Sequence, residues 1–179
     1  MSGKNRPRQR NGFCTNELII YPTHGVGKIV SIELNEFAET KLELFVIEFE
    51  KDQMTVRVPT EKSGRVGMRK LSGADVVKDA LAVLKGRSRV DHRIVWNRRI
   101  PEYEEKIKSG NLNSIAEVAR DLYRPRSLIA GQSFNERQVY ESALEHMARE
   151  IAAILKIDLD CAVTKIEDIL FSNFAQAAA

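Results

Sequence analysis

The pattern of apolar residues changes its period once along this 179-residue chain, after Leu71, and this change constrains the fold more than any other feature. Before it, short apolar runs alternate with turn residues, which is typical of strands. After it, apolar residues recur every three or four positions, which is typical of helices. We therefore predict an α+β fold made of two small domains, with the boundary between residues 71 and 72.

The first domain, residues 13–71, is predicted to be a small antiparallel β-barrel. Its strand-like runs are short, and turn compositions such as Pro22-Thr23-His24-Gly25 and Asn35-Glu36 separate them. Five short strands bury little apolar surface unless the sheet curls on itself, which favours an SH3-like or Tudor-like barrel. The predicted strands are Leu18–Tyr21, Gly27–Leu34, Leu42–Glu50, Met54–Pro59 and a short one at Val66–Arg69.

One glycine motif in this domain imitates a phosphate-binding loop. Gly25-Val26-Gly27-Lys28 looks like the end of that motif, but Pro22 replaces its first glycine and Ile29 replaces its serine or threonine. A β-type run follows, where the motif requires a helix. We therefore exclude a nucleotide site at this position and interpret the two glycines as turn residues.

The second domain, residues 72–174, is predicted to be a compact all-α domain of about five helices. Three of its helices carry a capping-box signature, a serine followed three residues later by an acid. The pairs are Ser72 with Asp75, Ser114 with Glu117, and Ser133 with Glu136. The predicted helices begin near residues 72, 97 to 100, 114, 133 and 160.

The two ends of the chain are predicted to lie outside these domains. Residues 1–12 carry four basic side chains, no acid and no apolar period, which is typical of a disordered basic tail. Residues 175–179 are small and uncharged, and we expect a flexible C-terminal tail. The formal charge of the whole chain is only +3, so a small local nucleic-acid contact is favoured over non-specific coating.

The stretch from Gly86 to Ile100 contains the only tryptophan, Trp96, together with five arginines and one aspartate. Arginines neutralise phosphates, and a large flat ring can stack on bases or wedge between them. Pro101 is tolerated only near a helix start, which places Trp96 at or just before a helix N-terminus. We predict an exposed ring in a DNA contact. The alternative is that Trp96 is a core anchor.

The sequence carries no signature of an enzyme, a metal site or a membrane protein. Two cysteines and three histidines are too few and too scattered for a disulfide framework or a zinc site. No run of eighteen apolar residues occurs, and no nucleophile elbow or paired-histidine helix is present. We expect a cytoplasmic protein, not an enzyme, with no cofactor, no metal, no membrane partner and no small-molecule substrate.

Several motifs occur together, in order and with consistent spacing, between about Leu18 and Phe171. In these motifs the chain resembles the CarD/CdnL family of bacterial transcription regulators. It resembles the CdnL type more closely than the longer members that are fused to a DNA-binding tail. The motifs are Tyr21-Pro22-Thr23-His24-Gly25-Val26-Gly27-Lys28-Ile29, Thr55-Val56-Arg57-Val58-Pro59, Trp96-Asn97-Arg98-Arg99, Lys106-Ile107-Lys108-Ser109-Gly110, Ile115-Ala116-Glu117-Val118-Ala119-Arg120-Asp121-Leu122 and Ser133-Phe134-Asn135-Glu136-Arg137.

The resemblance implies two partners for a monomeric protein. The β-domain would dock on the RNA polymerase β subunit, through the positions that Val46, Arg57 and Pro59 occupy here. The helical domain would contact promoter DNA at the upstream fork of the melted −10 region, where the matching Trp wedges into the minor groove and stabilises the open complex. The predicted DNA-binding residues are Trp96, Arg98, Arg99 and Arg93.

Two positions depart from the family pattern. Asn35 stands where some members carry an arginine toward polymerase, and Pro101 stands where some carry a basic residue, so neither contact is transferred. Two other functions remain open at this point. One is an RNA- or translation-associated Tudor-like module, and the other is an interaction adaptor in which Trp96 belongs to the core.

Overall fold

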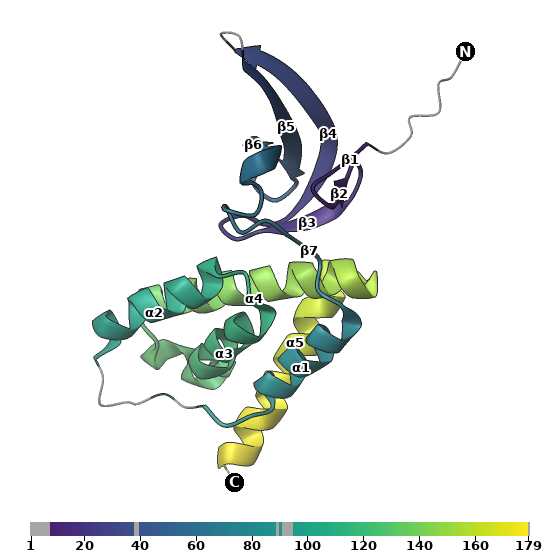
Figure 1. Ribbon diagram of the computed structural model, residues 1–179. Coiled ribbons are helices and arrows are strands. Elements are labelled where there is room, and N and C mark those ends of the chain that lie inside the picture. The colour runs from purple at the N-terminus through teal and green to yellow at the C-terminus, as the bar shows by residue number, and fades with distance from the viewer. Residues whose placement is uncertain (1–7, 38–39, 89, 91–94, 179) are drawn as a thin grey trace. The chain divides into compact units, whose positions relative to one another are not determined.

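The computed structural model describes residues 8–37, 40–88, 90 and 95–178. The chain divides into two compact units, Met1–Leu71 and Ser72–Ala179. The described part of the first unit is built from strands, and the described part of the second unit from helices (Figure 1). The α+β class predicted from the sequence is confirmed.

The first unit contains a five-stranded antiparallel sheet. Its strands pair in the order β6-β5-β4-β3-β7, and the two longest, β4 and β5, curve together (Figure 1). Among the described strands no ladder joins β6 to β7, so the sheet is curved but not closed. The strands are β3 (Leu18–Tyr21), β4 (Gly25–Phe37), β5 (Thr40–Phe49), β6 (Met54–Pro59) and β7 (Arg69–Lys70), with a 3₁₀ helix, η1 (Thr60–Lys62), after β6.

Alternation along the strands separates a core face from an outer face. Phe45, Ile47 and Phe49 on β5 are at most 1% exposed and belong to one apolar cluster with residues of β3, β4 and β6. The residues between them in the sequence point to the other face. The two faces of β5 follow from the period of two with which side chains alternate along a strand.

The chain between β4 and β5 does not turn where the sequence predicted. Asn35 and Glu36 have a turn composition, yet both lie in β4, with Asn35 opposite Leu42 and Glu36 opposite Lys41. The ladder continues as far as Phe37 and Thr40. Continued pairing with β5 satisfies the backbone groups of these residues, and it outweighs their weak local preference for a turn.

The interpretation of Gly27 as a turn residue is wrong. Gly25 has a positive φ of 76°, as expected at a turn, but Gly27 lies inside β4 opposite Ile19. A Cβ atom at Gly27 would lie 2.6 Å from Cε1 of Phe49 and 2.8 Å from Cγ2 of Ile47. Gly27 is therefore required because two large core side chains occupy the space next to its backbone.

We expect Gly27→Ala to lower the free energy of unfolding of the first unit by about 1–3 kcal/mol, because the added methyl group overpacks a filled core. Urea denaturation followed by circular dichroism measures this loss. Gly64→Ala is the matched control, since no atom lies within 4 Å of a Cβ at that position. Equal stability of the two variants would show that Phe49 moves aside at little cost.

The prediction of a disordered tail over residues 1–12 is wrong for its last residues. Strands β1 (Gln9–Arg10) and β2 (Phe13–Cys14) form a hairpin around Asn11 and Gly12, whose φ values are 46° and 83°. Two positive φ values in a two-residue loop are the reason that Asn-Gly is favoured there. Phe13 packs edge-on against Phe45 in the core, and this contact ties the hairpin to the first unit. Residues 1–7 lie outside the described part.

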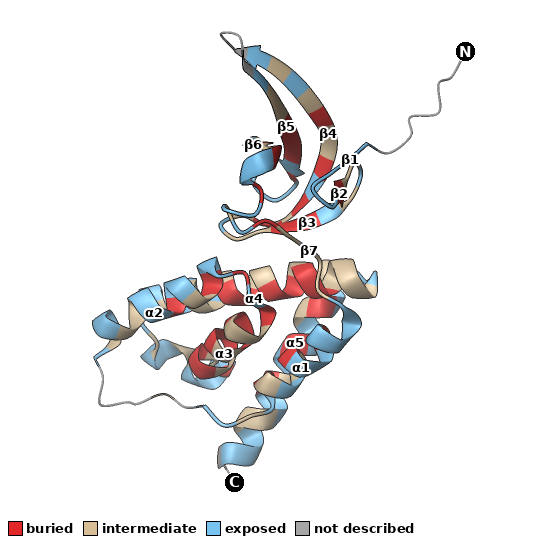
Figure 2. Cartoon of the chain, viewed as in Figure 1, coloured by how far each residue is buried: buried red, intermediate tan, exposed pale blue. Residues whose placement is uncertain are grey.

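The second unit has five α-helices within the described part, in agreement with the predicted number. Buried residues gather on α3 and on part of α4 (Figure 2). Helix α3 packs against α1, α2 and α4, and α4 also packs against α5. The helices are α1 (Ala74–Leu84), α2 (Trp96–Lys108), α3 (Leu112–Leu122), α4 (Phe134–Leu155) and α5 (Leu159–Ala178), with a 3₁₀ segment, η2 (Arg126–Gly131), before α4.

Only one of the three predicted capping boxes is present. At the start of α4 the Ser133 hydroxyl accepts from the amide of Glu136, and the Glu136 carboxylate accepts from the amide of Ser133. Helix α3 begins earlier than predicted, with Asn111 as its cap in place of Ser114. Helix α1 is preceded by Gly73, which gives no side-chain cap.

Ser72 is therefore not a helix cap, and it has a different role. Its hydroxyl donates to Oε1 of Glu150 at 2.7 Å and its amide donates to the same oxygen at 3.2 Å. Glu150 lies on α4 and is only 2% exposed. Ser72 bonds to a carboxylate 78 residues away in the sequence instead of capping α1. This bond is favoured because a buried carboxylate without hydrogen bonds is costly.

The predicted flexible tail at residues 175–179 is helical as far as the structure describes it. Helix α5 continues to Ala178. Alanine has the highest helix propensity, so an alanine-rich end continues an existing helix at little cost. Small uncharged residues at the end of the chain therefore do not end α5.

Candidate functional site

The three residues predicted to bind polymerase lie on one face of the first unit. Val46 on β5 is directly opposite Arg57 on β6, and Leu44 is directly opposite Pro59. Neighbours Phe45 and Val58 point into the core instead. We call the set Leu44, Val46, Arg57 and Pro59 the β5–β6 patch, because alternation places all four on the outer face.

The β5–β6 patch exposes one cation and contains two apolar side chains that are almost fully buried. Val46 is 5% exposed and Leu44 is 9% exposed, so the patch has an apolar floor outside the main core cluster. The Arg57 side chain is 55% exposed, and its Nε lies 3.4 Å from a carboxylate oxygen of Glu33 on β4. An exposed ion pair of this length contributes little to stability, so Arg57 can exchange Glu33 for another acid at small cost.

Strand β6 forms one edge of the sheet. It pairs with β5 on one side, and no other described strand pairs with its second side. The backbone groups on that side are suited to pair with an added strand of another protein. Arg57 and Pro59 of the β5–β6 patch, together with this edge, offer side-chain and backbone contacts to a protein partner.

The second candidate surface is the N-terminus of α2. The helix begins at Trp96 itself, and Val95 is its N-cap residue, with the amide of Arg98 donating to the carbonyl of Val95 at 2.9 Å. Pro101 lies within the first two turns of the helix, and Trp96 lies at the helix N-terminus, which is one of the two positions that the sequence predicted. The positive end of the helix therefore coincides with the tryptophan.

Trp96 is not the freely exposed ring that the sequence predicted. It is half-buried and packs against the core of the helical unit. Its ring lies 5.9 Å from that of Tyr103, two helical turns further on, and the Arg99 guanidinium lies over it at 5.6 Å. Because Trp96 is part of the helix, its ring folds back along the helix surface. Trp96 is therefore neither the fully exposed ring of the predicted wedge nor a fully buried core anchor.

The indole N–H of Trp96 is buried and has no hydrogen-bond partner among the described residues. The ring is held by packing against the helical core, including Tyr103, and by the cation–π contact with Arg99. Neither contact is a strong directional bond, so the ring can leave this position at moderate cost.

Two exposed side chains accompany the tryptophan. Val95 is 66% exposed, among the most exposed large apolar residues of the described chain, and Arg98 is exposed beside it on the first turn. The sequence predicted Arg98 and Arg99 as DNA contacts, but Val95 was not predicted. Periodicity could not reveal it, because the exposure of one valine depends on where the helix begins. Arg93, the fourth predicted DNA-binding residue, lies outside the described residues.

A buried ion pair lies close to Tyr103. The Nη2 atom of Arg120 is 2.9 Å from Oδ1 of Asp121, and the two side chains are only 9% and 8% exposed. Burial raises the pKa of the Tyr103 hydroxyl and the charge of Asp121 raises it further, while Arg99 acts in the opposite direction. The charge of Asp121 on α3 therefore acts on Tyr103, the ring against which Trp96 packs.

The described residues show neither a membrane helix nor a metal cluster. No described helix combines the length and the apolar character needed to cross a bilayer. Within the same part of the chain, no three His, Cys, Asp or Glu side chains come together as ligands for a metal ion.

The antiparallel β unit and the helical unit that follows it each match a family model, and together they indicate a transcription regulator. Residues 13–72 match the CarD-like/TRCF RID domain and residues 79–167 match the CarD C-terminal domain, and the chain belongs to the CarD family. It is also similar to a protein of Bacillus subtilis (strain 168) named "Putative transcription factor YdeB". The two are 32% identical over 143 residues, which cover 79% of this chain and 92% of the relative.

The family model for the first unit is that of an RNA polymerase-interacting domain, and it includes the whole β5–β6 patch. The model for the second unit includes Trp96 and its neighbours. The resemblance found in the sequence is therefore confirmed, and both candidate surfaces lie inside regions that the family shares.

Proposed function

We propose that this protein binds the β subunit of RNA polymerase through the β5–β6 patch and stabilises the open promoter complex through the N-terminus of α2. The observation that carries the proposal is the combination at that helix start. Val95 and Trp96 supply apolar bulk, and Arg98 and Arg99 supply positive charge within one helical turn. Minor-groove proteins that kink DNA use this pairing of an apolar wedge with basic side chains.

The preference for melted DNA follows from the cost of unstacking. Inserting apolar bulk at a base step costs a few kcal/mol in an intact duplex, and least where the duplex has already opened. The ring of Trp96 must also leave the helical core, where its contact with Tyr103 alone contributes about 0.5–1.5 kcal/mol beyond the apolar area that it buries. The cost of moving the ring is the same for intact and melted DNA, whereas the cost of unstacking is smallest at the fork between them, so binding there favours the open complex.

Weak DNA binding is sufficient in this scheme. The chain carries a formal net charge of only +3, so its affinity for free DNA is expected to be low. Docking of the first unit on polymerase raises the local concentration of the second unit at the promoter. The docking surface therefore supplies affinity, and the helix start supplies the preference for the melted state.

We expect Trp96→Ala to shorten the lifetime of the open complex about tenfold, which corresponds to a loss of about 1.4 kcal/mol of preference for the melted state. Binding to polymerase should be unchanged, because the β5–β6 patch is untouched. The lifetime is measured by the decay of promoter complexes after addition of a competitor.

Two further variants make the test specific. Val95→Ser removes exposed apolar bulk beside Trp96 without disturbing the core, and it should shorten the lifetime in the same direction. Phe134→Ala removes a 67% exposed aromatic ring elsewhere in the helical unit, and it should leave the lifetime unchanged. Full lifetime in both the Trp96 and the Val95 variants would contradict the wedge.

A further inference from the structure

A hollow of about 680 Å³ in the helical unit is not used by the proposed function. It lies between the end of α3, the chain that follows α1, and the last turns of α5. Its charged and aromatic lining residues are Arg87, Arg120, Arg124, Asp121, Tyr123 and Phe174. Pockets of about 300–1,000 Å³ are typical of small-molecule sites.

The lining of this hollow is positively charged. Three arginines face one acid, Asp121, whose carboxylate is already paired with Arg120. Arg124 donates from Nη1 to the carbonyl of Tyr123 at 2.7 Å, which leaves its other guanidinium donors available. Arg87 is exposed, and no described residue gives it an ion pair or a hydrogen bond. The site therefore has cationic donors without a matching number of acids.

Two rings form the apolar part of the lining. Tyr123 and Phe174 lie 6.4 Å apart at an angle of 71°, and both are half-buried. Burial raises the pKa of the Tyr123 hydroxyl, and the charge of Glu167 raises it further, so the ring is neutral near pH 7. A planar heterocycle can stack on one of these rings while its charged substituents reach the arginines.

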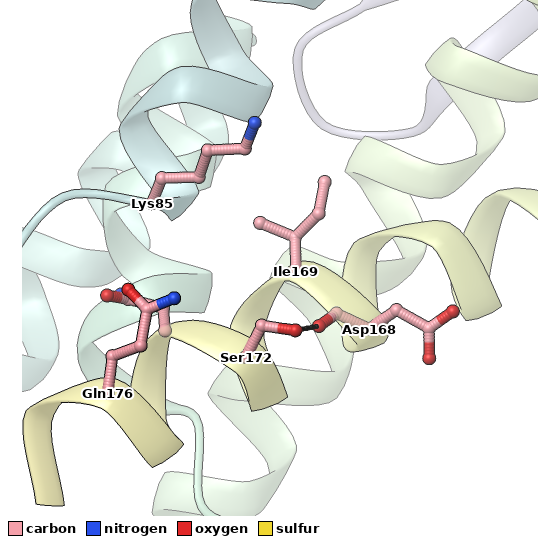
Figure 3. A pocket seen from close by; sticks show the side chains of 6 residues that line it. Lys85, Asp168, Ile169, Ser172 and Gln176 are labelled. Atoms are coloured by element: carbon pink, nitrogen blue, oxygen red, sulfur yellow. Dashed lines mark hydrogen bonds between the residues drawn. The ribbon is translucent and has the colours of Figure 1, made fainter. Parts of the chain in front are cut away.

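The frame of the hollow is held by α5. Nδ2 of Asn173 donates to the carbonyls of Leu84 and Gly86, both at 2.9 Å, and so fixes the chain that carries Arg87. An adjoining hollow of about 390 Å³ shares Asn173 and contains Lys85 and Asp168 (Figure 3). Its charges balance. An anion is therefore expected to prefer the hollow with the three arginines.

We propose that this hollow binds a nucleotide, with its phosphate groups on Arg87 and Arg124 and its base against Tyr123 or Phe174. Arginine recognises phosphate through two parallel N–H donors, which gives geometry as well as charge. The arginines and the rings lie on the same hollow, and a nucleotide matches that combination better than inorganic phosphate or an uncharged planar molecule.

The test is calorimetric titration of the full chain with ATP, GTP, pyrophosphate and adenosine. A nucleoside triphosphate is expected to bind, and adenosine is expected to bind at least about tenfold more weakly because it lacks the phosphates. Arg87→Glu should weaken triphosphate binding at least about tenfold. Lys78→Glu, the same charge change on an exposed turn of α1, should alter it less than about twofold.

Other outcomes would contradict nucleotide binding in this hollow or change the ligand assigned to it. Absence of triphosphate binding at about 1 mM would overturn the proposal, as would equal affinity of the wild type and the Arg87 variant. Pyrophosphate binding as tightly as ATP would exclude a role for the base. A short DNA duplex that binds with the same dependence on Arg87, while ATP does not bind, would assign the arginines to the DNA backbone instead.

Discussion

Arg57→Glu is expected to weaken binding to the isolated lobe of the polymerase β subunit at least about a hundredfold, because it places a carboxylate where the proposed interface has a guanidinium. The substitution also sets a second carboxylate beside Glu33, whose oxygen lies 3.4 Å from Nε of Arg57 in the wild type. The fold should survive, since the Arg57 side chain is 55% exposed. Surface plasmon resonance with the purified lobe measures the affinity.

Arg65→Glu is the matched control for this prediction. Arg65 is exposed in the loop between η1 and β7, and the substitution makes the same change in net charge. If the β5–β6 patch binds specifically, the affinity of the Arg65 variant for the lobe should stay within about threefold of the wild-type affinity. Equal losses in both variants would indicate long-range attraction between net charges, and unchanged binding of the Arg57 variant would remove the β5–β6 patch from the interface.

Asp121→Ala is expected to lower the free energy of unfolding of the helical unit by about 3–5 kcal/mol, because it leaves the Arg120 guanidinium buried without its counter-charge. Both Nε and Nη2 of Arg120 lie 2.9 Å from Oδ1 of Asp121, and the side chains are 9% and 8% exposed. A loss of this size is a large share of the stability of a domain. Urea denaturation followed by far-ultraviolet circular dichroism measures it.

Two comparisons separate burial from charge pairing in this experiment. Glu104→Ala removes an exposed ion pair with Lys108, and it should cost less than about 0.5 kcal/mol. Replacing Arg120 and Asp121 together by leucine should recover most of the loss, because no unpaired charge is left in the core. A loss below about 1 kcal/mol for Asp121→Ala would mean that Arg120 reaches solvent or another acid.

The sequence predicted best those features that depend on neighbours in the chain. The capping box at Ser133 and Glu136 is present because its two partners are three residues apart and need nothing else. The Asn11-Gly12 hairpin is equally local, and its turn signature was overlooked because the surrounding arginines resembled a tail. Strands β3 and β6 have the predicted bounds.

The predictions that failed depend on residues far away in the sequence. Ser72 was assigned to a helix cap, but the buried Glu150 takes its hydroxyl. Gly27 was assigned to a turn, but Phe49 occupies the space that a side chain would need. In each case the local preference contributes about 1 kcal/mol to the free energy of folding, and burial in the core contributes more.

The sequence by itself determined the two units, the membership of the CarD family and most of the positions that form the two candidate surfaces. Only the tertiary structure decided how those positions are presented: Trp96 half-buried on Tyr103, Val95 exposed in its place, and three arginines around one hollow. Exposure and charge pairing are properties of packed neighbours. Residues that meet across helices leave no periodic pattern from which their contacts could be predicted.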